Sequence, residues 1–155
     1  MSSSIPADIL LRLQEWCAEA ERAPMDLKRK LMRMKLDISH FPSILERLET
    51  AGFMSSERYI LAFIDRQSRI KKWGKKKIQQ ALLTKGLSSR PDHFERAGFT
   101  EEEGKTRLIA ILQKKNSGLR EPDPAKRKAK LIRFALSRGY TLTDILSVLK
   151  TINHS

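Results

Sequence analysis

Apolar residues in this sequence recur three and four positions apart, and four runs of them stop at a glycine. That spacing is typical of one face of an α-helix, whereas the alternation expected of a β-strand is nearly absent. Gly52, Gly86, Gly98 and Gly139 stand where a helix ends on a left-handed residue. The pattern predicts an all-α fold of about nine short helices. The apolar residue after each glycine is expected to pack back on the finished helix: Phe53, Leu87, Phe99 and Tyr140.

The starts of several helices are marked as well. Ser55 precedes one apolar run, and Thr100 with Glu103 has the spacing of a capping box. Asp123 stands before a proline, which suits an N-cap followed by the first helical position. We therefore expect helices to begin just after these residues.

The helices are expected to come in threes. The sequence ERLETAGF ends at Phe53 and the similar HFERAGF ends at Phe99, which suggests a repeat about 50 residues long. Three tandem three-helix modules follow from this spacing, at residues 5–53, 54–99 and 100–153. Coincidence between short helix-end signals is the alternative. Because Pro91 lies in the last helix of the second module, that helix is expected to be short or to start late.

The chain is strongly basic but carries enough apolar residues for a core. It has 31 Lys and Arg against 18 Asp and Glu, a net charge of +13, and 40% apolar residues, which argues against full disorder. The basic residues cluster on the expected second helix of each module: Lys28, Arg29, Lys30, Arg33 and Lys35, then Lys75, Lys76, Lys77 and Lys85, then Lys126, Arg127, Lys128, Lys130 and Arg133. Modules stacked with a constant rotation would join these clusters into one surface for a polyanion. An ordinary solvated helix face is the alternative for each cluster.

The densest basic segment is RQSRIKKWGKKK at residues 66–77, in which seven of twelve residues are basic and none is acidic. It joins the first and second helices of the second module. Phosphates bind such a segment with release of counterions, and an exposed Trp73 could stack on an unpaired base. The alternative is that Trp73 packs under the turn while the lysines are solvated around it.

The sequence offers little for catalysis or metal binding. Cys17 is the single cysteine, so no disulfide or cysteine-based zinc site is expected, and its apolar helix face predicts burial. His40, His93 and His154 have no partner at metal-ligand spacing, and common catalytic and phosphate-loop motifs are absent. The acidic residues 101–103 suit the start of a helix. Without a membrane-spanning stretch or a secretory signal, we expect a soluble intracellular protein that is not an enzyme and uses no cofactor or metal ion.

Residues 55–87 contain a recognisable set of motifs: Arg58-Tyr59, Arg66, Trp73-Gly74, Lys76-Lys77-Ile78 and Gly86-Leu87. The segment resembles the central signature of the RecX family of bacterial recombination regulators. Residues 123–149 are similar to the third module of that family, a basic helix ending in Arg-Gly-Tyr at 138–140, and residues 26–53 match its first module less closely. The family usually has glycine before the tryptophan and proline after Gly74; Lys72 and Lys75 make this turn more basic.

The resemblance implies an elongated, curved array of three helix-turn-helix-like modules that binds the RecA filament on DNA. Such a regulator restrains RecA ATP hydrolysis and strand exchange, and so acts in recombinational DNA repair and the SOS response. Such a protein would be a monomer in the bacterial cytoplasm. Its expected partners are RecA and single-stranded DNA, and double-stranded DNA is a further candidate. A general DNA-binding protein of the helical-repeat type is the alternative. The residues expected to bind nucleic acid or the filament are Arg58, Arg66, Arg69, Lys71, Lys72, Trp73, Lys75, Lys76, Lys77, Lys28, Arg29, Arg33, Lys126, Arg127, Lys130 and Arg133.

Overall fold

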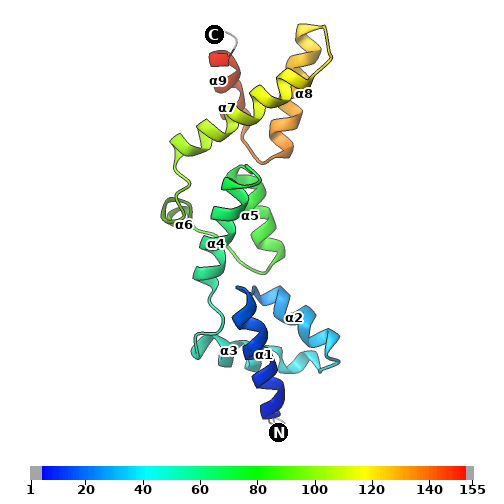
Figure 1. Cartoon of the computed structure of the whole chain (residues 1–155), viewed down its shortest axis with the longest axis vertical. Helices are drawn as coiled ribbons and strands as arrows, with labels where there is room; N and C mark the ends of the chain where they lie inside the picture. Colours follow the sequence, from blue (N-terminus) through cyan, green and yellow to red (C-terminus); the bar gives the residue numbers. More distant parts are fainter. Residues whose placement is uncertain (1–4, 153–155) are drawn as a thin grey trace. The chain divides into compact units, whose positions relative to one another are not determined.

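A computed structural model describes residues 5–152, and within this range every regular element is a helix (Figure 1). The all-α prediction is therefore confirmed; residue 153, the expected end of the third module, lies outside the described range, as does His154. The elements in chain order are α1 (Ala7–Glu19), α2 (Pro24–Arg33), the 3₁₀-helix η1 (Ile38–His40), α3 (Phe41–Thr50), α4 (Ser56–Arg69), α5 (Lys75–Thr84), α6 (Pro91–Arg96), α7 (Glu101–Gly118), α8 (Pro124–Ser137) and α9 (Leu142–Ile152).

The expected glycines end four of these helices in a left-handed conformation. Their φ angles are 81°, 84°, 84° and 97° at Gly52, Gly86, Gly98 and Gly139. Three of the following apolar residues are buried as expected, namely Leu87, Phe99 and Tyr140.

The expectation is wrong for Phe53, which is 36% exposed, whereas Met54 is only 3% exposed. Both backbone N–H groups donate to the Leu48 carbonyl, so the chain turns one residue further before a side chain enters the core. The general signal for a helix end was correct, but it did not determine which side chain returns to the core.

The expected helix starts are also confirmed. The Thr100 hydroxyl accepts from the Glu103 N–H at 3.1 Å, and the Ser55 hydroxyl accepts from the Arg58 N–H at 3.2 Å. The Asp123 carboxylate likewise caps α8. The helix α6 begins at the expected proline and is only six residues long.

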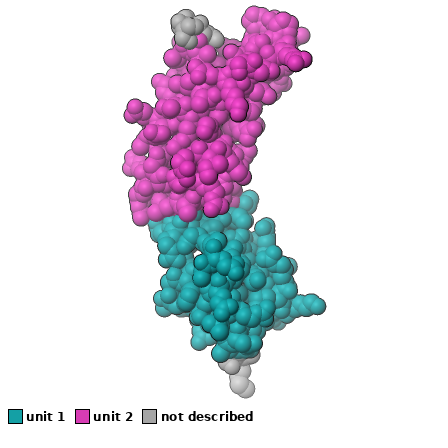
Figure 2. Space-filling view, in the orientation of Figure 1, with its two compact units in different colours: residues 1–60, 82–88 teal, residues 61–81, 89–155 magenta. Residues whose placement is uncertain are grey.

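The chain divides into two compact units, shown in different colours in Figure 2. Unit 1 comprises residues 1–60 and 82–88, and unit 2 comprises residues 61–81 and 89–155. The helices α4 and α5 each contribute to both units, so this division by contacts does not follow the expected modules, whose boundaries stay a prediction.

Each unit has its own apolar core. In unit 1 one cluster of buried residues comes from α1, α2 and α3 and the segment after it: Leu13, Cys17, Leu27, Leu31, Ile44, Leu48 and Met54. In unit 2 one cluster comes from α7, α8 and α9 with the turn before α9: Leu108, Leu112, Leu131, Ala135, Tyr140, Ile145, Val148 and Leu149. Burial raises the pKa of the Cys17 thiol, in agreement with the expected role of this residue as a small buried apolar side chain.

Candidate polyanion-binding surface

The basic segment 66–77 consists of the end of α4, a tight turn and the first residues of α5. Lys72 has a φ of 56°, a left-handed conformation that is uncommon for any residue but glycine. The Trp73 N–H donates to the Gln67 carbonyl at 3.0 Å, six residues back, one residue further than in a Schellman helix end. Because its φ is positive, Lys72 occupies a conformation that glycine adopts most readily.

This α4–α5 turn is joined through its backbone to the α8–α9 turn, within unit 2. The Gly74 N–H donates to the Arg138 carbonyl at 2.7 Å, and the Lys76 N–H donates to the Gly139 carbonyl at 3.1 Å. A Cβ on Gly74 would lie 2.5 Å from the Gly139 oxygen. The two backbones are thus too close for a side chain at Gly74.

Tyr140 contacts the α4–α5 turn through a hydrogen bond from its side chain. Its hydroxyl donates to the Lys72 carbonyl at 2.7 Å, and the residue is only 6% exposed. Burial raises the pKa of Tyr140 to about 12, and the positive charge of nearby Arg107 offsets only part of this increase. At neutral pH the hydroxyl is protonated and can donate this hydrogen bond.

Trp73 is neither fully buried nor free in solvent. Its ring is partly exposed, with the Lys71 Nζ 5.2 Å and the Lys77 Nζ 4.6 Å from the ring centroid. The Lys77 Nζ also donates to the Ser137 carbonyl at 3.3 Å. The ring therefore lies between the two alternatives in exposure, with two cations close to it, and its stacking on a base stays a prediction.

The lysines of this region carry positive charge that the protein does not neutralise by direct contact. Five of them form no ion pair with any carboxylate of residues 5–152, and we call them the lysine cluster: Lys71, Lys72, Lys75, Lys76 and Lys77. Glu101 and Asp144 line a cavity of about 310 Å³ together with two of these lysines, but form no ion pair with either. On α4, Arg69 pairs with Asp65 at 3.3 Å, while Arg66 is exposed.

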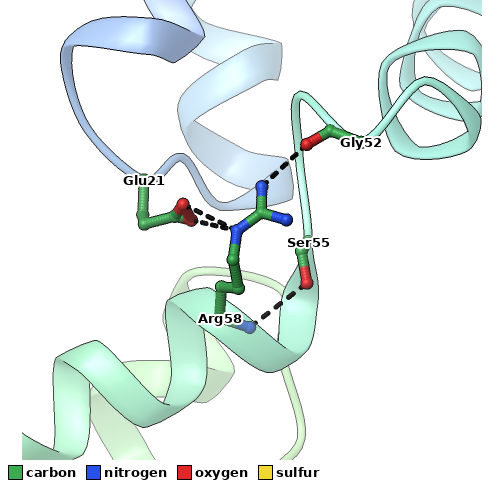
Figure 3. A network of polar contacts seen from close by, with 4 residues as sticks. All are labelled: Glu21, Gly52, Ser55 and Arg58. Atoms are coloured by element: carbon green, nitrogen blue, oxygen red, sulfur yellow. Dashed lines mark hydrogen bonds and ion pairs between the residues drawn. The ribbon is translucent and has the colours of Figure 1, made fainter.

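Arg58 has a different environment, within unit 1 (Figure 3). Its Nε donates to the two Glu21 carboxylate oxygens at 2.9 and 3.2 Å, and its Nη2 donates to the Gly52 carbonyl at 2.9 Å. The side chain ties the α1–α2 loop and the end of α3 to the start of α4. Its guanidinium is therefore already engaged inside the protein.

The expected residues on α2 are only partly engaged. Arg29 and Arg33 are exposed and lie one helical turn apart on the same face. The Lys28 Nζ lies 5.1 Å from the centroid of the Phe41 ring. Of these three expected residues, two therefore face solvent and the third lies on an aromatic ring.

Of the expected residues on α8, two already have partners within the protein and two are exposed. Arg127 donates to the carbonyls of Asn116, Leu119 and Glu121 at 3.0 to 3.1 Å and so holds the α7–α8 loop. Lys130 pairs with Glu121 at 3.0 Å, and this contact lowers the pKa of the Glu121 carboxyl. The remaining expected residues are exposed: Lys126 and Arg133.

Two basic residues that were not among the expected contact residues lie on one aromatic ring. The Lys115 Nζ and the Arg138 guanidinium carbon each lie 5.0 Å from the Phe134 ring centroid. Arg138 belongs to the α8–α9 turn, whose backbone contacts the lysine cluster. The Arg-Gly-Tyr motif at 138–140 was the available signal, but it gives no hint that this turn meets the other.

The described residues contain no evident metal centre. No group of three or more His, Cys, Asp or Glu side chains between residues 5 and 152 could hold a metal ion. His93 is buried, and its Nδ1 accepts from the Arg90 N–H at 2.8 Å at the start of α6. Within the same range no helix combines the length and the apolar character needed to cross a membrane.

Comparison with protein families gives two matches. The model for "RecX, second three-helix domain" matches residues 57–90, and the model for "RecX, third three-helix domain" matches residues 101–149. Together they include the α4–α5 turn and the α8–α9 turn.

Several curated proteins named "Regulatory protein RecX" are similar to this chain. The Leptothrix cholodnii protein is 28% identical over 145 residues, covering 92% of this chain and 88% of its own. The Pseudomonas entomophila protein is 29% identical over 147 residues, with coverage of 94% and 93%. The Clostridium botulinum protein is 30% identical over 128 residues, covering 78% of this chain but only 59% of its own.

Two solved structures share the fold. A crystal structure of regulatory protein RecX superposes with a TM-score of 0.81 at 17% identity, covering 93% of this chain and 71% of the other. The crystal structure of RecX from Lactobacillus salivarius gives 0.76 at 14% identity, covering 97% and 100%. These likenesses support the tandem arrangement of three-helix modules.

Proposed function

Because this chain belongs to the RecX family of regulatory proteins, we propose that it binds the RecA recombinase filament on DNA and restrains its ATP hydrolysis and strand exchange. It would do so without chemistry of its own, as a monomer in the bacterial cytoplasm. The observation that supports this role is the lysine cluster, which presents several cations without an ion-pair partner on a turn with a fixed backbone. DNA phosphates attract such a surface through counterion release.

The predicted contact residues are not equivalent in this proposal. We expect the lysine cluster and Trp73 to contribute most to binding. A second group consists of cations that are exposed: Arg66, Lys126, Arg133, Arg29 and Arg33. We rank Lys28 and Arg69 with this second group, although Lys28 lies on an aromatic ring and Arg69 pairs with a carboxylate. Three predicted contacts would have to leave partners inside the protein to reach a phosphate: Arg58, Arg127 and Lys130.

The test is RecA ATP hydrolysis on single-stranded DNA, with RecA from the same organism and this protein titrated in. Binding of this protein to the same DNA without RecA is measured at matched salt. Loss of hydrolysis at amounts far below those that coat the DNA is the expected result. Loss only at amounts that saturate the DNA would replace the proposal with a general DNA-binding protein that competes for phosphate.

The surface is tested with a pair of charge-reversal variants of equal net charge. Lys71→Glu combined with Lys76→Glu should weaken filament binding at least tenfold and lower the slope of log affinity against log salt by about 2. Lys114→Glu combined with Lys150→Glu, on exposed positions of α7 and α9, is the matched control. Equal weakening by both pairs would show that net charge, and not the lysine cluster, sets the affinity.

A further inference from the structure

We propose that the α4–α5 turn and the α8–α9 turn form one composite surface for a nucleic-acid phosphodiester backbone, with Arg138 as a contact residue and Tyr140 as the positioning residue. The inference rests on the proposed function, because it names residues that complete the surface of the lysine cluster. Residues of the region that matches the third RecX domain, 101–149, would then belong to the same binding site as the lysine cluster in residues 57–90.

The backbone contact between the turns makes them one rigid piece within unit 2. Gly74 and Lys76 each donate an N–H to the α8–α9 turn, and both Gly74 and Gly139 lack the side chain that would separate the turns. A Cβ on Gly139 would lie 2.5 Å from the Lys77 Cβ and 2.6 Å from its nitrogen. The lysines of the cluster are therefore positioned by residues about 60 positions further along the chain, as a helical-repeat fold allows.

Tyr140 is the residue that stabilises the unusual conformation of this turn. Lys72 is left-handed without being glycine, and strain of this kind persists only where the surroundings hold it. The Tyr140 hydroxyl meets the Lys72 carbonyl at 2.7 Å from a buried position. Without this bond Lys72 can return to an ordinary conformation, and the spacing of Lys71, Trp73 and the following lysines would change.

Arg138 is well placed to contact the same ligand as the lysine cluster. Its carbonyl accepts the Gly74 N–H, so its Cα is held beside the turn, and its guanidinium rests on the Phe134 ring. Lys77, which lies over the Trp73 ring, reaches across to the Ser137 carbonyl next to it. Side chains ordered in this way lose less entropy when a ligand binds.

Phosphodiester is the ligand that this composite surface fits. Arg138 has no ion pair with a described carboxylate, like the five lysines beside it. The half-exposed Trp73 ring adds an aromatic surface among these cations. Cations that follow a backbone next to an aromatic ring are the combination that binds single-stranded nucleic acid.

The experiment measures binding of a dye-labelled oligothymidylate by fluorescence anisotropy, with circular dichroism melts of every variant. Tyr140→Phe should weaken binding at least fivefold at a temperature where the variant is folded, and Tyr59→Phe, the same change at the other tyrosine, should stay within twofold. In a Lys72→Gly background, Tyr140→Phe should change the affinity less than twofold, because glycine adopts the left-handed conformation unaided. A purely structural role for Tyr140 predicts the same weakening in both backgrounds and would overturn the inference.

Arg138 is tested separately, because its side chain can be changed without touching the backbone contact. Arg138→Gln should weaken binding about fivefold and lower the salt slope by about 1, whereas Arg47→Gln on the exposed face of α3 should change neither. Displacement of the oligonucleotide by polyglutamate at the same concentration of charge would overturn the assignment to phosphodiester.

The two levels of the proposal fail differently. Absence of oligothymidylate and filament binding by the unaltered protein would overturn the proposed function and this inference with it. Normal binding by the unaltered protein with no loss in Tyr140→Phe and Arg138→Gln would overturn the composite surface alone.

Discussion

Replacing Gly139 by alanine should destabilise the protein more than the same change at a glycine that lacks a close contact. The new Cβ would overlap Lys77, and the φ of 97° is unfavourable for alanine. To relieve the overlap the two turns must separate, which breaks the two backbone bonds between them and the bond from Tyr140 to Lys72. Three hydrogen bonds contribute about 3 kcal/mol and the left-handed backbone about 1 kcal/mol, so the expected loss in the free energy of unfolding is about 4 kcal/mol.

Three other glycines separate the two causes. Gly74→Ala has the overlap without a left-handed φ and should cost about 3 kcal/mol. Gly98→Ala has the left-handed φ with open space around the Cβ and should cost about 1 kcal/mol. Gly118→Ala, at the end of α7 with neither feature, should stabilise the protein by about 0.5 kcal/mol.

Urea unfolding of these variants measures the differences. In a Trp16→Phe background, Trp73 is the remaining indole and reports on unit 2, while circular dichroism reports on all helices. A loss at Gly139 no larger than the loss at Gly98 would show that the turns separate without cost and would refute the contact as a source of stability.

Three further outcomes follow from single side chains. Asp26→Ala removes the bond to the Ala23 N–H and the half-buried ion pair with Lys85, so urea unfolding should show a loss of about 1–2 kcal/mol. Because the folded-state pKa of Tyr140 is raised from 10.0 to about 12, its contribution is complete below pH 10 and is lost as the pH rises towards 12. At pH 11 the unaltered protein should lose about 1.4 kcal/mol that Tyr140→Phe does not lose, as measured by urea unfolding at pH 8 and 11. Burial and a raised pKa should make Cys17 react with a thiol reagent far more slowly in the native protein than in urea, and equal rates would contradict its burial.

Local signals in the sequence were enough to predict the helices. A glycine that needs a positive φ, or a hydroxyl that caps an N–H three residues ahead, involves only neighbours in the chain. The ends at Gly52 and Gly98 and the starts after Ser55 and Thr100 were therefore predictable. Phe53 was not, because the choice between it and the next residue depends on space in the core.

The basic clusters could be located on their helices, but not sorted into free and engaged residues. Arg58 binds Glu21 from 37 positions earlier, and Arg127 binds Asn116 across a loop. Periodicity does not determine which basic residue meets which carboxylate or carbonyl, since such pairs depend on tertiary packing. For the same reason the contact between Gly74 and Gly139 has no signature beyond the two glycines themselves.

Lys72 adds a cation to the α4–α5 turn but lowers the free energy of unfolding relative to glycine at the same position. A glycine there would relieve a left-handed conformation that costs an ordinary residue about 1 kcal/mol, but it would remove one cation from the turn. The Tyr140 hydroxyl offsets part of this cost and keeps the strained turn in place. Lys72→Gly should therefore raise the free energy of unfolding by about 1 kcal/mol while weakening polyanion binding, as expected where strain is kept for function. A Lys72→Gly protein that is no more stable than the unaltered one would show that the turn is not strained, and the loss of affinity would then come from charge alone.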